Sequence, residues 1–85
     1  MKLIYCKECR DVVNLDFVER ECKCGRSRGR YKDSLNAVIM GPCVPLGISN
    51  ASLQEAIRWR PDSGRGSVVE AFVIPKKCET VERLY

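Results

Sequence analysis

The sequence predicts a small α+β fold with a metal-stabilised end, and three observations lead to that expectation. Four cysteines in the first third of the chain form two close pairs, several short runs rich in β-branched and aromatic residues follow, and one segment carries both a helix start and a helix stop. The chain has 85 residues, and a domain of this size buries only about 60% of its unfolded surface. We therefore expect a single domain over residues 1–85, with a bound metal supplementing a marginal core.

The paired cysteines have the spacing of a tetrahedral metal site. They are Cys6, Cys9, Cys22 and Cys24, and Gly25 follows the last of them. Zinc takes four thiolates at about 2.3 Å, and pairs separated by one or two residues can chelate one ion without distorting the backbone. Glycine adopts positive φ cheaply, which lets an amide face a ligand sulfur. We expect one structural Zn²⁺ per chain in a zinc-ribbon hairpin at residues 1–32, and an α+β portion at residues 33–85.

Disulfide and redox uses of the cysteines are weaker alternatives. Charged residues appear before an apolar stretch of about 7 residues can form, so no secretory signal is visible, and we expect a cytoplasmic chain with reduced thiols. A thioredoxin-like motif at Cys6 and Cys9 needs a βαβ context. Cys43 and Cys78 have no partner nearby in the sequence and are interpreted as small apolar residues.

Composition disfavours catalysis and membrane insertion. The chain contains no histidine to act as a base for a nucleophile such as Cys43, and four protein ligands leave a zinc ion no open position. No run of about 18 apolar residues occurs, so no membrane span is expected. The formal net charge of +4 is compatible with nucleic acid without requiring it.

The expected strands follow from short apolar patterns. Residues 2–5, 12–18 and 37–40 are predicted strands, and pairing resumes at 31–32. Residues 26–30 are polar and irregular, and residues 43–47 have the glycine and proline content of a loop. Residues 68–75 form the most continuous apolar run and predict a central strand that Pro75 ends. Residues 81–85 are too few to assign.

A short helix is predicted within residues 48–61. Ser49, Asn50 or Ser52 can cap it, Ser52 and Glu55 have capping-box spacing, and Pro61 cannot continue it. Its apolar stripe is only two turns long, and we expect it to lie on the antiparallel sheet. The stripe consists of Leu53, Ala56 and Ile57, with Arg60 on the same face.

Two groups of cations, each with an aromatic residue, are the candidate ligand-binding residues. Arginine makes bidentate contacts with phosphate and an aromatic ring stacks on a base, so these groups predict a phosphate-bearing ligand, either nucleic acid or a nucleotide. A solvated loop explains the first group equally, and an aromatic ring folded over the core edge explains the second. The first group is Arg26, Arg28, Arg30, Tyr31 and Lys32; the second is Arg58, Trp59, Arg60 and Arg65.

The chain also resembles a group of small phage and bacterial proteins that have no assigned activity. The similarity rests on the first CxxC, CKCG at 22–25, RGRY at 28–31, LNAVI at 35–39, VPLGISN at 44–50 and EAFVIPK at 70–76. It implies a non-enzymatic binder, such as a phage accessory protein that inhibits host defence. It implies no residue role beyond the cysteine ligands.

The leading hypothesis is a zinc-stabilised, non-enzymatic protein that binds a phosphate-bearing ligand. The alternative is a protein-interaction module that inhibits a host enzyme, or joins two copies of the chain, through Trp59 and the outer face of the helix.

Overall fold

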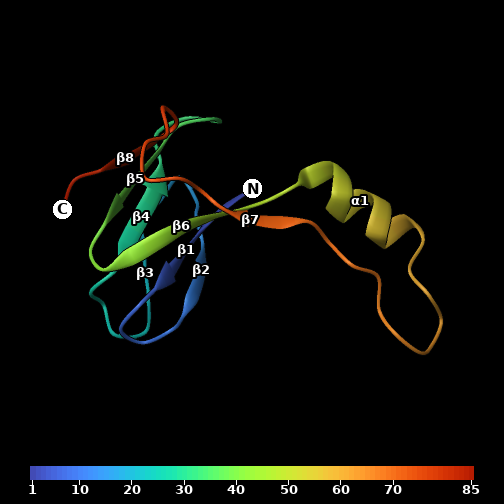
Figure 1. Ribbon diagram of the computed structural model, residues 1–85. Helices are drawn as coiled ribbons and strands as arrows, with labels where there is room; N and C mark the ends of the chain where they lie inside the picture. Colours follow the sequence, from blue (N-terminus) through green and yellow to red (C-terminus); the bar gives the residue numbers. More distant parts are fainter.

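The computed structural model describes residues 1–85 as a body of two four-stranded sheets from which an arm projects (Figure 1). The first sheet contains, in order, β2 (Val12–Asn14), β1 (Lys2–Cys6), β6 (Cys43–Ile48) and β7 (Ala71–Val73), and each pair is antiparallel. The second contains β3 (Arg20–Glu21), β4 (Arg28–Tyr31), β5 (Ala37–Met40) and β8 (Val81–Arg83). The arm carries the helix α1 (Asn50–Arg58). The α+β class is thus confirmed.

The two sheets interleave the two predicted portions of the chain. Each sheet takes two strands from residues 1–32 and two from residues 33–85. A zinc-ribbon hairpin that leads into one antiparallel sheet is therefore not confirmed. The second sheet is also mixed, because β8 pairs with β5 in parallel register.

The hydrophobic core lies between the sheets and is small. Strand β5 is buried along all four residues, as its apolar sequence predicts, and Ile39 is 1% exposed. Three of the eight residues in the main core cluster are cysteines, so the core and the thiol groups are not separate features. The cluster contains Ile4, Cys6, Val13, Leu15, Cys22, Ala37, Ile39 and Cys43.

The prediction of a loop at residues 43–47 is wrong. These residues belong to β6, which lies between β1 and β7 in the first sheet. The carbonyl of Pro45 accepts a hydrogen bond from the Ile74 amide at 2.9 Å, so the proline still contributes an acceptor there. A Cβ at Gly47 would lie 2.4 Å from the Phe72 ring, so glycine lets the ring approach the strand. The residues that suggested a loop are here accommodated within a strand.

The prediction of a central strand at residues 68–75 is also wrong. Of residues 68–75 only β7 is a strand, and it is an edge strand whose three residues are all exposed. Residues 12–18 likewise form a strand only at β2. Conversely, residues 28–30, expected to be irregular, belong to β4, where a Cβ at Gly29 would lie 3.0 Å from the Leu15 side chain. Close contact between elements decides these cases more than local composition does.

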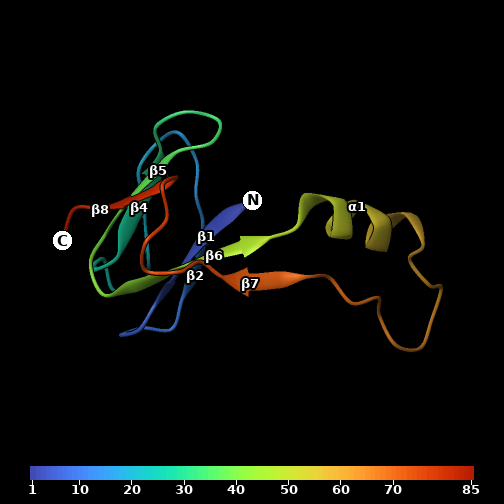
Figure 2. The same ribbon diagram turned by 45° about the horizontal axis from the view of Figure 1, so that its top comes forward.

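The helix does not pack on the sheet, which corrects the sequence prediction. It stands on the arm, away from the body in both views (Figures 1 and 2), and none of its residues is buried. Its apolar stripe instead faces the returning loop, where Leu53, Ala56 and Ile57 line a shallow hollow together with Val69. The loop shields Leu53 and Ala56 in part, but Ile57 stays 63% exposed.

Hydrogen bonds hold the arm's two sides together at its base. The Ser49 side chain caps α1 by accepting from the Ser52 amide at 3.2 Å, as expected for an N-cap. The predicted capping box is wrong, because the Ser52 hydroxyl accepts from the Glu70 amide at 2.8 Å. This bond lies next to the pairing of Ile48 with Ala71, where β6 and β7 meet.

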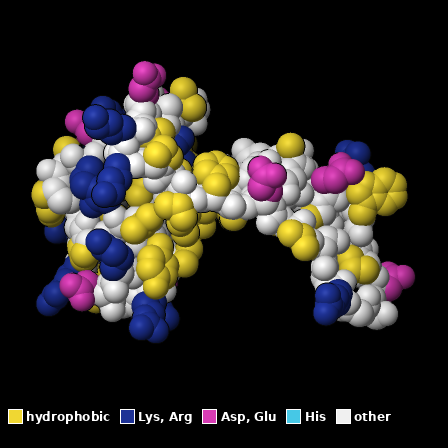
Figure 3. All heavy atoms as spheres, in the orientation of Figure 1, with side chains coloured by type: hydrophobic (Ala, Val, Ile, Leu, Met, Phe, Trp, Pro, Cys, Tyr) yellow, Lys and Arg dark blue, Asp and Glu magenta, His cyan; other side chains and the backbone are white.

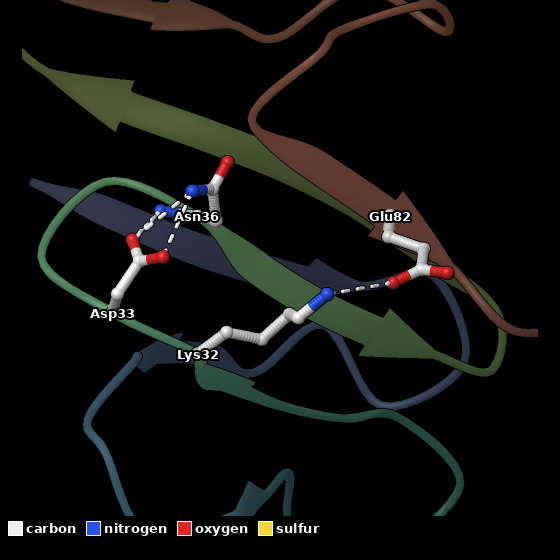
Figure 4. Close-up of polar contacts among 4 residues, drawn as sticks. All are labelled: Lys32, Asp33, Asn36 and Glu82. Atoms are coloured by element: carbon white, nitrogen blue, oxygen red, sulfur yellow. Dashed lines mark hydrogen bonds and ion pairs between the residues drawn. The ribbon is translucent and has the colours of Figure 1, made fainter.

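The connection between β4 and β5 is an ordered polar turn (Figure 4). Asp33 accepts hydrogen bonds from the Leu35 and Asn36 amides and from the Asn36 side chain. Beside it, Lys32 reaches Glu82 of β8 at 3.4 Å. The ion pair adds a side-chain contact to the parallel pairing that holds β8 in the second sheet.

No helix in the structure has the length and apolar content needed to cross a membrane.

Candidate metal centre

The four predicted ligand cysteines come together. Their sulfur atoms all lie within 4.8 Å of one another, close enough to hold a metal ion. The Cys6 and Cys24 sulfurs are 3.7 Å apart, and those of Cys22 and Cys24 are 3.4 Å apart. Four sulfurs at about 2.3 Å from a tetrahedral centre would be separated by about 3.8 Å. The arrangement therefore suits one tetrahedral ion, and the cysteines form no disulfide.

The first ligand pair lies in the turn between β1 and β2. The Cys6 amide donates to the Asp11 carbonyl at 2.9 Å, and the Arg10 amide donates back to the Cys6 carbonyl at 2.8 Å. Arg10 has φ of 63°, a conformation uncommon for a residue with a side chain. The turn brings Cys9 back towards the sulfur of Cys6 at the end of the strand.

The second ligand pair lies in the turn between β3 and β4. Gly25 has φ of 74°, as the sequence predicted, and its amide donates to the Cys22 carbonyl at 3.0 Å. The Ser27 amide donates to the Cys22 sulfur at 3.4 Å, the kind of bond that favours a thiolate. The ligand pairs thus belong to hairpins of different sheets, and the site joins the two sheets.

The thiols of the site influence one another's ionisation. Burial opposes ionisation of Cys22, but the Ser27 backbone and the neighbouring thiols outweigh it and lower its pKa to about 6. The Arg26 backbone favours the thiolate of Cys24, yet burial and the other three thiols raise its pKa to about 12. Ionisation of one thiol therefore opposes ionisation of the next. A bound divalent cation would reverse this, since it deprotonates its thiol ligands outright.

Ser27 was not predicted and is the most deeply buried polar side chain near the site. It is 0% exposed, and its hydroxyl has no partner at hydrogen-bond distance. The pKa of Cys6 is lowered by the Cys9 backbone first and, at longer range, by this hydroxyl. A polar atom buried at this place fits a charged sulfur cluster better than an apolar core.

The two remaining cysteines lie outside the ligand set. Cys43 is 1% exposed opposite Cys6 in the β1–β6 register, and burial raises the pKa of its thiol. Cys78 is half-buried beside Thr80, 3.3 Å from its hydroxyl. Neither belongs to the group of four, which is the one cluster of metal-ligand side chains in the structure.

The first cation group lies on and beside β4, and most of its members form ion pairs or hydrogen bonds. Arg26 pairs with a glutamate at 3.6 Å, Arg28 with another at 3.8 Å, and Lys32 with a third. The Tyr31 hydroxyl accepts from the Lys2 amide at 2.7 Å, and its ring packs against Phe17. Arg30 is the exposed member without an ion pair.

The second cation group lies on the arm and is free of carboxylate partners. Arg58, Arg60 and Arg65 are exposed, and none forms an ion pair. Trp59 is 69% exposed and does not fold over the core; its indole N–H donates to the Glu55 carboxylate at 2.8 Å. The two groups belong to different parts of the molecule, and the structure does not combine them into one site.

The sequence also missed a third group of cations on the body. Lys7, Lys76 and Arg83 line one hollow between the sheets, although Lys7 is far in the chain from the other two. No local pattern indicates such a group, because it forms only when β1 pairs with β6, β6 with β7 and β5 with β8.

No protein-family model, curated protein or solved structure matches this chain.

Proposed function

We propose that the protein is a small, non-enzymatic interaction module, in which one structural Zn²⁺ stabilises the body and the arm contacts a partner protein. The observation that carries this proposal is the exposed apolar surface of the arm. α1 buries none of its residues, and Ile57, Trp59 and Val68 are 63%, 69% and 92% exposed. Apolar side chains also stand out over the arm in Figure 3. Large exposed apolar groups held together on one projection typically mark a contact site.

Zinc is the metal that the ligand set favours. Four thiolates in a tetrahedral arrangement select zinc or iron–sulfur chemistry over hard cations such as Mg²⁺. Four protein ligands complete the coordination sphere and leave no position for water or substrate, which supports a structural role. The ion would then stabilise the body from which the arm projects.

The charge of the arm favours a protein partner over nucleic acid. The arm, residues 49–70, contains three arginines and three carboxylates, which cancel, so the positive net charge of the chain belongs to the body. Nucleic-acid binding depends on neutralising phosphates with surplus cations. Protein contacts instead centre on buried aromatic anchors flanked by arginine, and Trp59 between Arg58 and Arg60 has that composition.

The arm can be removed without cutting a strand pair, which makes the proposal testable. Ile48 and Ala71 are paired, so a two-residue Asn-Gly turn can replace residues 49–70. Native protein, the arm-less variant and Trp59→Ala would be used as baits in lysate from the source organism, with sedimentation measuring self-association. Tyr85→Ala is the matched control, because Tyr85 is a similarly exposed aromatic residue on the body.

We expect native protein and Tyr85→Ala to hold the same partner, which is either another protein or a second copy. The arm-less variant and Trp59→Ala should lose it, with at least a tenfold fall in affinity for an anchor residue. A partner that the arm-less variant still holds would contradict the proposal.

A phosphate-bearing ligand, nucleic acid or nucleotide, is the second candidate. It is favoured by Arg30, which is exposed on β4 without a carboxylate partner, and by the exposure of the neighbouring ion pairs. Such pairs contribute at most about 1 kcal/mol, so a phosphate can replace the carboxylates. Fluorescence polarisation at low salt with single-stranded, duplex and nucleotide probes tests it. Binding no tighter than about 100 μM, the weak edge of non-specific binding, would reject it.

A further inference from the structure

We propose that the hollow between the two sheets of the body binds a small organic anion, with an apolar carbon body and a single acidic head group. This site is distinct from the arm, and its failure would leave the proposed interaction of the arm untouched. The hollow has a volume of about 580 Å³ and opens between the segment that follows β7 and the strand β8. Its size falls within the range of about 300–1,000 Å³ that is usual for small-ligand pockets.

The floor of the hollow is apolar. Ile39 of β5 and Val44 of β6 contribute to it, and Val73 and Ile74 line the side where the chain leaves β7. Figure 3 shows hydrophobic side chains gathered over β6 on the body, with Lys and Arg side chains beside them. The floor is built largely on strands, and Ile39 and Ile74 belong to the buried core, so this part of the hollow is pre-formed. Transfer of a hydrocarbon group from water to this surface is favourable. Because the surface is pre-formed, little protein ordering opposes the binding.

The charged lining of the hollow is entirely positive. Lys7, Lys76 and Arg83 line it, no aspartate or glutamate does, and none of the three cations takes part in an ion pair. The three ion pairs of the structure lie elsewhere, so the charge of the hollow is not compensated. Several cations that line one apolar hollow with no counter-charge attract an anion.

Arg83 is held in place before any ligand arrives. Its guanidinium donates to the Gly41 carbonyl at 2.7 Å and also to the Cys43 carbonyl. Carbonyl oxygens fix its orientation and leave its charge un-neutralised. A guanidinium has five N–H donors, so the remaining donors are available for a carboxylate, sulfonate or phosphate oxygen. A pre-positioned donor lowers the entropy that binding must overcome.

The lining also restricts the ligand's body. It contains no aromatic side chain, so the stacking that nucleic-acid bases use has no platform here. An aliphatic chain or a single ring is the group that aliphatic walls accommodate best. The acidic head would lie near Arg83 and the lysines, and the carbon body would lie over Ile39 and Val44.

Three probes separate the two parts of this chemistry. Octanoate has both the charge and the apolar body, octanol has only the body, and acetate has only the head group. Each would be titrated into ¹⁵N-labelled, zinc-loaded full-length protein, with binding followed by amide chemical shifts. We expect octanoate to bind with Kd below about 1 mM, as a ligand of its size permits, and to shift the amides of β6, β7 and β8. Octanol should bind at least about fivefold more weakly, and acetate should not saturate.

Matched variants test the residues. Lys76→Gln should weaken octanoate binding about two- to fivefold, the usual value of one exposed charge pair, whereas the neighbouring Lys77→Gln should not change it, because Lys77 does not line the hollow. Val73→Glu changes an exposed lining residue, so it preserves folding and should abolish binding by adding negative charge. Equal affinity for octanoate and octanol, shifts confined to the arm, or equal effects of the two lysine variants would each overturn the proposal.

Discussion

Replacing Gly41 by alanine should destabilise the body by about 2–5 kcal/mol. Gly41 has φ of 94°, where a side chain costs about 1–2 kcal/mol. An added Cβ would lie 1.9 Å from the Arg26 carbonyl oxygen and 2.9 Å from its carbon. Both atoms belong to the backbone, so no side chain can rotate away, and forced displacement adds about 1–3 kcal/mol. The two costs together give the predicted loss.

Gly25→Ala is the matched control, because it isolates the conformational cost. Gly25 also has positive φ, at 74°, but its nearest contact would be a flexible carboxylate oxygen of Glu21 at 3.8 Å. We expect this variant to lose only about 1–2 kcal/mol. The free energy of unfolding of both zinc-loaded variants would be measured by urea denaturation, followed by far-ultraviolet circular dichroism.

The overlap at Gly41 should also reach the metal site. Arg26 follows the second ligand turn directly, so the chain relieves the overlap most easily by moving that turn. Gly41→Ala should therefore release zinc to a competing chelator more readily than the native protein does. Equal loss of stability in the two variants would refute the close approach of Gly41 to Arg26.

Three further changes test other parts of the structure. Chelation of zinc, or Cys22→Ser, should unfold the body, since structural zinc contributes on the order of 10–16 kcal/mol, and Cys78→Ser should keep one zinc per chain by native mass spectrometry. Asp33→Asn should lower stability equally at pH 5.5 and pH 7.5, because hydrogen bonds from Asn36 lower the pKa of Asp33 to about 2. A carboxyl with a lowered pKa stabilises the fold above its unfolded value and loses that contribution only as the pH falls from about 4 towards 2; urea denaturation at both pH values checks this. Ser49→Ala should lower the helix signal of the arm by weakening its cap by about 0.5–2 kcal/mol, while the unfolding of the body stays unchanged; hydrogen exchange of α1 compared with β5 separates the two effects.

The features predicted well are those that local sequence determines. The cysteine spacing identified four residues whose sulfurs do come together, and Gly25 has the expected positive φ. The cap at Ser49 and the buried strand β5 also follow from their own residues. In each case the physical cause lies within a few positions of the chain.

The features predicted wrongly depend on distant contacts. Residues 43–47 contain a proline and a glycine, yet pairing with β1 makes them a strand. Residues 68–75 are largely apolar, yet only residues 71–73 pair, as an edge strand of the first sheet, and residues 68–70 lie on the arm. Apolar content predicted burial there, whereas Val68 and all three residues of β7 are exposed. The cations at the hollow come from three separate segments and have no signature in sequence.

The position of the metal centre has a consequence for the order of folding. Cys6 and Cys24 are 18 positions apart, whereas β1 pairs with β6 and β5 pairs with β8 across much longer stretches of chain. Closing a short loop costs less entropy than closing a long one, and non-local pairing is the slow part of folding. Metal capture can therefore come first and act as a nucleus, with β1 and β4 presented on either side of it as templates. The refolding rate of this chain should then depend on how fast zinc is captured. The pairing of β6 with β1 and of β8 with β5 would follow that step.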